Sequence, residues 1–425
     1  ASNNTAFGSS ALTANTTGTG NVAVGSEAFS DNTTGSFSTA LGSLSLFEST
    51  TGSGNTALGR RALQENTTAS NNTGAGIEAL RYNTTGTQNT SVGATALKQN
   101  TTANNNTAVG YAALLSNTTG TANVVVGSTA LDANTTGDSN VAIGHNSLSA
   151  NTTADNNTAV GRDSLRLNTT GASNVAVGAN ALDANTTASN NLAVGHNALS
   201  ACTTGSNNLG VGNNALLNIT TAVNNVAIGR DALENSTSSN QVAVGFKALE
   251  ANTSGSSNTA LGYSALLANT TGTQNTAVGS NALDANTTGV ENTAVGTNSL
   301  TKNTTGANNT ALGRNTLEDN VSGSNNTAVG GDAMIDNTAD NNTAIGRSAM
   351  RVNTTGTRNT AVGPLALDAN TTADNNTAVG EQALTSNTTG AENTVSGQGA
   401  MSVNTTGSFN VAMGASSLQN NTTAS

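Results

Sequence analysis

The chain has 425 residues, of which 35% are hydrophobic, 9% charged and 2% aromatic. Soluble domains carry about 25% charged residues, so this composition argues against ordinary globular domains and for one quasi-linear architecture. With 13 Lys and Arg and a net charge of -11, we expect no nucleic-acid-binding surface. No apolar run approaches the roughly 20 residues of a membrane span, so we expect no membrane insertion. A single Cys excludes an internal disulfide framework.

A glycine recurs 25 times along the chain, at a spacing of 17 residues that shortens twice to 16. The two short spacings run from Gly229 to Gly245 and from Gly330 to Gly346. The repeating unit reads N-[TV]-A-[VIL]-G-x-x-A-L-x-x-N-T-T-[GA]-x-x, and residues 106–122 are one clear copy. We number its positions 1 to 17 from the first Asn. Because nothing interrupts the series, we expect a single repeat domain over residues 1–425, a rod without evident caps.

Within each unit, positions 1–5 predict a short strand whose positions 2 and 4 share one face. A turn should follow the Gly, a second strand is expected around positions 7–11, and a second turn around N-T-T-G. Helical periodicity is absent. The sequence therefore predicts an all-β fold, a parallel β-solenoid or β-roll of about 25 coils with 17 residues each. At a strand spacing of about 4.8 Å, such a rod would be roughly 120 Å long.

Equivalent residues of stacked coils should form columns along the solenoid. We expect the Val, Ile or Leu at position 4 and the apolar residue at position 9 to supply the buried apolar surface. Asn occupies position 1 in 23 coils and position 12 in 21 coils, which predicts two hydrogen-bonded asparagine ladders. Two copies represent these structural columns: Asn106, Val109, Gly110, Leu114 and Asn117, and Asn275, Val278, Gly279, Leu283 and Asn286.

Two alternative interpretations concern the polar columns. The N-T-T triplets match the N-glycosylation sequence, so Asn117 and Asn286 are candidate glycan acceptors. An exposed array of Thr could instead order water and bind ice. Against ice binding, position 2 alternates Thr with Val and Leu, and the second Thr pair is adjacent rather than spaced along one strand face.

Residues suited to catalysis or metal binding are sparse. His145 and His196 both follow the repeating Gly, three coils apart, so they cannot share a metal ion. Cys202 replaces Asn at position 12, and Glu234 and Glu250 form a weak acidic pair in neighbouring coils. We expect no catalytic residues, no cofactor and no metal site, and therefore no enzyme.

Each coil offers little apolar surface against the entropy of ordering 17 residues. We therefore expect the chain to associate with itself, as a homotrimer or as a head-to-tail or bundled filament. The Thr/Val row at position 2 and the small Ala rows are the candidate seam between chains. A host or abiotic surface is a further partner.

The motif N-T-A-V-G-x-x-A-L, found at residues 106–114 and 275–283, resembles the head repeats of YadA-like trimeric autotransporter adhesins. The full unit with N-T-T-G, as in residues 275–289, is similar to repeats of bacterial and phage tail-fibre-like proteins. The resemblance implies a left-handed parallel β-roll made by three identical chains. The present coil is longer than the adhesin head repeat.

These observations favour an extracellular structural fibre, secreted or at the cell surface, with adhesion as an additional role. One alternative is the shaft of a trimeric adhesin or a phage-like tail fibre. Another is an ice- or surface-binding protein that uses its Thr rows.

Overall fold

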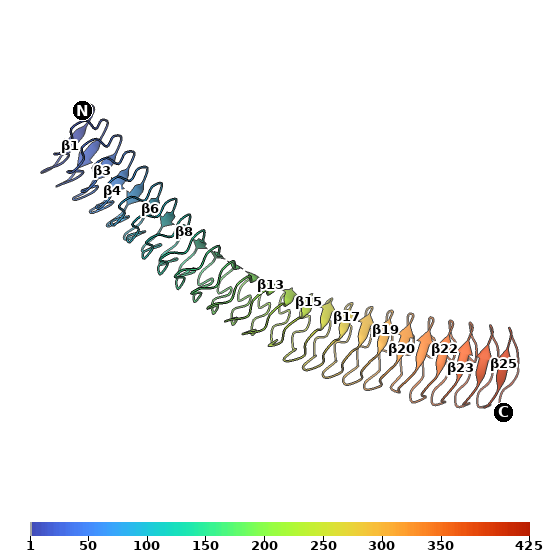
Figure 1. Cartoon of the computed structure of the whole chain (residues 1–425). Helices are drawn as coiled ribbons and strands as arrows, with labels where there is room; N and C mark the ends of the chain where they lie inside the picture. The colour runs from blue at the N-terminus through green and yellow to red at the C-terminus, as the bar shows by residue number, and fades with distance from the viewer. Residues whose placement is uncertain (1) are drawn as a thin grey trace. The chain divides into compact units, whose positions relative to one another are not determined.

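The computed structural model describes residues 2–425, which divide into two compact units after Asn213. In each unit the chain winds into coils of the expected 17-residue period, and each coil contributes one short strand (Figure 1). The strands of the first unit are β1 (Thr5–Phe7), β2 (Val22–Val24), β3 (Thr39–Leu41), β4 (Thr56–Leu58), β5 (Thr73–Ala75), β6 (Thr90–Val92), β7 (Thr107–Val109), β8 (Val124–Val126), β9 (Val141–Ile143), β10 (Thr158–Val160), β11 (Val175–Val177), β12 (Leu192–Val194) and β13 (Leu209–Val211).

The second unit repeats the same architecture. Its strands are β14 (Val226–Ile228), β15 (Val242–Val244), β16 (Thr259–Leu261), β17 (Thr276–Val278), β18 (Thr293–Val295), β19 (Thr310–Leu312), β20 (Thr327–Val329), β21 (Thr343–Ile345), β22 (Thr360–Val362), β23 (Thr377–Val379), β24 (Thr394–Ser396) and β25 (Val411–Met413). Residues 2–425 contain no helix, and hence none that could cross a membrane.

Within each unit, consecutive strands pair in parallel, and each residue pairs with its equivalent one coil further on. In the first unit Thr107 pairs with Val124, and in the second unit Thr276 pairs with Thr293. This register brings like positions of successive coils together in columns, as the repeat predicts. The all-β parallel β-solenoid is therefore confirmed.

The predicted second strand at positions 7–11 is wrong, because these positions form turns in every coil. Positions 7 and 9 both adopt left-handed backbone conformations, with φ of 52° at Ala112 and 53° at Leu114. The N–H of Ala112 donates to the preceding coil, at Ala94 O (3.0 Å), and the N–H of Leu114 donates to the following coil, at Ala130 O (3.0 Å). These bonds between coils satisfy backbone groups that a strand would otherwise have paired.

The core differs from the expected one at position 4. Positions 2 and 4 do share a face, but that face points outward, so Val109 and Val278 are partly exposed. The buried apolar columns are instead position 3, position 8 and position 9, represented by Ala108, Ala113 and Leu114, all 0% exposed. Because the Ala columns lie inside the coil, they cannot form a seam between chains.

The repeating Gly at position 5 is required by its backbone. Gly110 and Gly279 have φ of 138° and 139°, a conformation that L side chains rarely adopt. A Cβ on Gly110 would also collide with the carbonyl oxygen of Gly127 in the next coil. The chain can therefore turn at the end of each strand only because position 5 is glycine.

The two shortened repeats lose their residue in the second turn. Around residues 236–239 and 337–340, the regular N-T-T-G turn is replaced by a shorter connection. The strands on either side stay in register, with Val226 opposite Val242 and Thr327 opposite Thr343. The second turn thus absorbs a change in length without disturbing the strand column.

Candidate functional site

The asparagine at position 1 links the strand to the second turn of its own coil and to the next coil. Asn106 Nδ2 donates to Gly120 O at 2.9 Å, and Asn106 Oδ1 accepts the backbone N–H of Asn123 at 2.9 Å. Asn275 makes the same contacts with Gly289 O (2.8 Å) and with the N–H of Asn292 (3.0 Å). Each side chain therefore acts both across a coil and along the column.

The asparagine at position 12 forms the second ladder. Asn117 Nδ2 donates to Asn100 Oδ1 in the preceding coil (3.0 Å) and to Gly120 O in its own coil (2.9 Å). Asn286 Nδ2 does the same with Asn269 Oδ1 (2.8 Å) and Gly289 O (3.1 Å). The carbonyl at position 15 thus receives one donor from each ladder, which uses both of its lone pairs. The predicted asparagine ladders are confirmed.

The candidate glycosylation asparagines lie inside the coil. Asn117 and Asn286 are 0% exposed, and both hydrogens of each Nδ2 are engaged in the ladder. A glycan on this nitrogen would replace one donor and would need space that the folded coil does not have. Modification at these positions is therefore incompatible with the ladder geometry.

The second ladder has weak points where position 12 changes or its turn is shortened. Among the described residues, Asn32 Oδ1, Asn185 Oδ1 and Asn320 Oδ1 are buried without a hydrogen-bond partner. In the following coil, position 12 is Ser49, Cys202 or, where the turn is one residue shorter, Asn337. In each case the amide that would donate to the orphaned oxygen is missing or displaced.

The single cysteine and the two histidines have no shared chemistry. Cys202 is 0% exposed, and its Sγ lies 3.2 Å from Gly205 O. Burial raises the pKa of this thiol to about 11, which disfavours the reactive thiolate. His145 and His196 are exposed at position 6 of coils three apart, as predicted.

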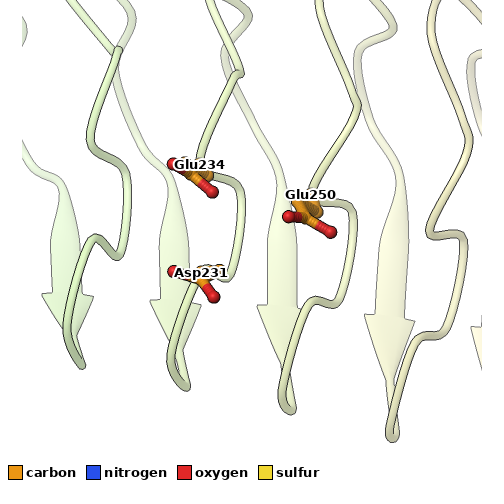
Figure 2. Close-up of side chains that lie close together, drawn as sticks. All are labelled: Asp231, Glu234 and Glu250. Carbon is orange, nitrogen blue, oxygen red and sulfur yellow. The ribbon is translucent and has the colours of Figure 1, made fainter.

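Three acidic residues form a compact cluster in the second unit (Figure 2). Asp231 and Glu234 follow β14 and Glu250 follows β15, and one carboxylate oxygen from each lies within 4.8 Å of the others. The sequence indicates only the pair Glu234 and Glu250. Asp231 joins them because the turn brings position 7 beside position 10, a proximity that linear spacing does not reveal.

Cations already neutralise part of this acidic cluster. Arg230 Nε lies 3.1 Å from Asp231 Oδ2, and Lys247 Nζ lies 3.0 Å from Glu250 Oε1. Burial, followed by the charges of Asp231 and Glu250, raises the pKa of Glu234. Oxygen atoms of this kind are ligands for hard cations, but two of the three carboxylates already have charged partners. We therefore interpret the cluster as an ion-pair network.

Side chains at positions 7 and 10 line an open groove in the first unit. It has a volume of about 550 Å³ and is bordered by Asn146, Asp163, Arg166, Asn180, Asp183, Asn197 and Ser200. Its position-7 side chains bond along the column, as where Asn146 Nδ2 donates to Asp163 Oδ1 at 3.1 Å. Arg166 Nη2 lies 3.8 Å from Asp183 Oδ2. The groove is thus polar and largely paired within itself.

Comparison with known proteins adds no identification, because no family model and no curated protein matches the chain.

Proposed function

We propose that the chain is a structural fibre protein, secreted or held at a cell surface, whose role is mechanical extension and resistance to unfolding. The observation that carries this proposal is the repetition of one bonding scheme throughout each unit. The same asparagine contacts found at Asn106 and Asn117 recur at Asn275 and Asn286. A chain built from nearest-neighbour contacts gains stability with every added coil.

The distribution of reactive groups also supports a mechanical role. The exposed histidines lie in separate coils, the thiol is buried, and the acidic cluster is largely occupied by Arg230 and Lys247. Catalysis requires convergent titratable groups around a substrate cavity. We propose contact with surfaces, rather than a reaction, as the second element of the function.

Self-association is part of the proposal. The partner is another copy of the chain, in a homotrimer or in a filament whose copies are bundled or stacked head to tail. Adhesion would follow from many weak contacts repeated along such a filament, because linked contacts add avidity.

Electron microscopy of the purified chain tests the fibre proposal. We expect filaments many times longer than one chain, and we expect the double variant Asn117→Ala and Asn286→Ala to form fewer of them because each change leaves a buried amide unpaired. A matched control is the exposed Asn213→Ala. Uniform short rods would favour the shaft of an adhesin or tail fibre, and particles without elongation would overturn the proposal.

Ice binding is a second candidate that one structural observation favours. Position 2 is Thr in nine consecutive strands, β16 to β24, and this position faces outward. The Thr hydroxyls therefore form a regular row beside the aliphatic row at position 4. Thermal hysteresis measured on the purified chain would support this function, and its absence would remove it.

A further inference from the structure

The outward face of the strands is free of charge. We define the strand face as positions 2 and 4 of the coils in the second unit, from β14 to β25. The whole chain contains 13 basic and 24 acidic residues, and none of them stands at positions 2 to 4 of any coil. Charged side chains cluster instead in the turns that follow the strands, as Arg230, Asp231 and Glu234 do after β14.

The strand face is also apolar and continuous along the unit. From β14 to β23, position 4 carries an at least partly exposed aliphatic side chain in every coil, with Leu261 and Leu312 each 46% exposed and Ile345 41% exposed. Beside this row, position 2 is Thr or Val throughout the unit. Soluble monomers rarely expose contiguous apolar patches larger than a few hundred Å², so this face has the character of a contact surface.

The area of the strand face is on the scale of a protein interface. A three-residue strand is about 10 Å long and neighbouring strands lie about 4.8 Å apart, so the 12 strands of the unit span roughly 600 Å² in projection. Accessible area exceeds projected area, and a standard interface buries about 800 Å² per partner. One unit therefore carries nearly enough surface for a stable contact.

Charge decides which partner suits this face. The net charge of -11 disfavours association between copies wherever acidic side chains would meet. On the strand face no charge has to be buried or brought near its like, so two copies can approach there without the cost of desolvating ions. Compact Thr, Val, Ile and Leu side chains in regular rows also permit close sheet-on-sheet packing, with about 10 Å between the sheets.

We infer that the strand face packs against the same face of a second copy of this chain, around a two-fold axis. A two-fold contact uses one patch on both partners, which a row of identical coils supplies. This inference rests on the proposed function, since it names the lateral contact by which fibres would associate. The Thr run, which includes Thr293, Thr310 and Thr327, lies at the centre of the contact.

Sedimentation velocity over a range of concentrations tests the inference on the full chain. We expect the wild type to associate, and the triple variant Thr293→Lys, Thr310→Lys and Thr327→Lys to weaken association by more than about 100-fold, because unpaired ammonium groups would be buried. The matched control places the same charges at position 6, as Ser280→Lys, Thr297→Lys and Gly331→Lys. We expect the control to associate like the wild type, and circular dichroism to show both variants folded.

Two outcomes would overturn the inference. They are a wild type that stays monomeric at every concentration, with or without thermal hysteresis, and a strand-face variant that associates normally. Electron microscopy separates this result from the fibre proposal. If both the wild type and the strand-face variant form filaments, the fibre proposal stands and the strand-face contact is rejected. If the variant loses association but the wild type forms no filaments, the strand-face contact is supported and the fibre proposal is rejected.

Discussion

Asparagine suits both ladders because its short side chain carries two donors and an acceptor on one plane. At position 12, Asn117 uses its donors on Asn100 and Gly120, while its oxygen accepts from Asn134 Nδ2 at 2.9 Å. No shorter or apolar side chain reproduces all three bonds. The buried orphan oxygens, such as that of Asn32, show what happens when the next coil lacks the amide.

Ser49→Asn should therefore stabilise the protein. The introduced amide would donate to Asn32 Oδ1, and its oxygen would replace the Ser49 hydroxyl, which Asn66 Nδ2 now reaches only at 3.4 Å. We expect the free energy of unfolding to rise by about 1 kcal/mol, measured by chemical denaturation. Ser26→Asn, at an exposed position of a neighbouring coil, is the control and should change little. A loss of stability in Ser49→Asn would contradict the ladder interpretation.

At the scale of the element, each coil is one three-residue strand joined by turns. Left-handed residues at positions 7 and 9 let the turn follow the coil while its amides bond to neighbours on both sides. Asn and Asp tolerate this conformation, which explains residues such as Asn180 (φ 57°) and Asp163 (φ 56°) at position 7. Position 9 keeps Leu despite the strain, because its side chain fills the core.

Asn180 offers a test of this backbone strain. Asn180→Val and Asn180→Gly both remove the bond from Asn180 Nδ2 to Asn197 Oδ1 (3.1 Å), but only Val is disfavoured at positive φ. We expect the Val variant to be less stable than the Gly variant by about 1–2 kcal/mol, measured by thermal unfolding. Equal stability of the two variants would mean that the left-handed conformation at position 7 imposes no cost.

At the scale of the whole molecule, charge is confined to the turns and is partly desolvated there. Burial is the main cause that raises the pKa of Asp132, Asp183 and Asp284, all at position 10. Glu78 behaves in the opposite way, because its hydrogen bond with Lys98 lowers its pKa. The three Asp residues therefore favour the folded state at acidic pH, whereas Glu78 favours it at neutral pH.

Asp132 should make the protein less stable at neutral than at acidic pH. Because its pKa is higher in the folded than in the unfolded state, the folded state binds the proton more tightly, and stability is lost as pH rises through the folded pKa. Asp132→Asn should therefore stabilise the protein at pH 7, and the gain should vanish as pH falls below the ordinary range of carboxyl pKa values. Thermal unfolding at several pH values measures this difference. Glu291→Gln, at an exposed position, is the control, and a gain that persists in acid would contradict the explanation.

Much of the architecture could be predicted because the repeat imposes its own register. A 17-residue period with Gly110 and Gly279 in equivalent places requires like residues to meet, and buried columns of Asn then need partners that only neighbouring coils supply. The site was less predictable. Glu234 and Glu250 were found from their spacing, whereas Asp231 required knowledge of how the turn folds back.

Parallel stacking and the two asparagine ladders could be inferred from the amino-acid sequence alone, because both follow from the repeat length and its strict positions. Which strand face lies inside depends on how the folded coil packs. Because side chains alternate between the two faces of a strand, Thr107 and Val109 must share a face, but this alternation does not say whether that face is buried. The narrow interior of the coil accommodates Ala108, Leu114 and the ladder amides, so the larger strand side chains are left on the outside.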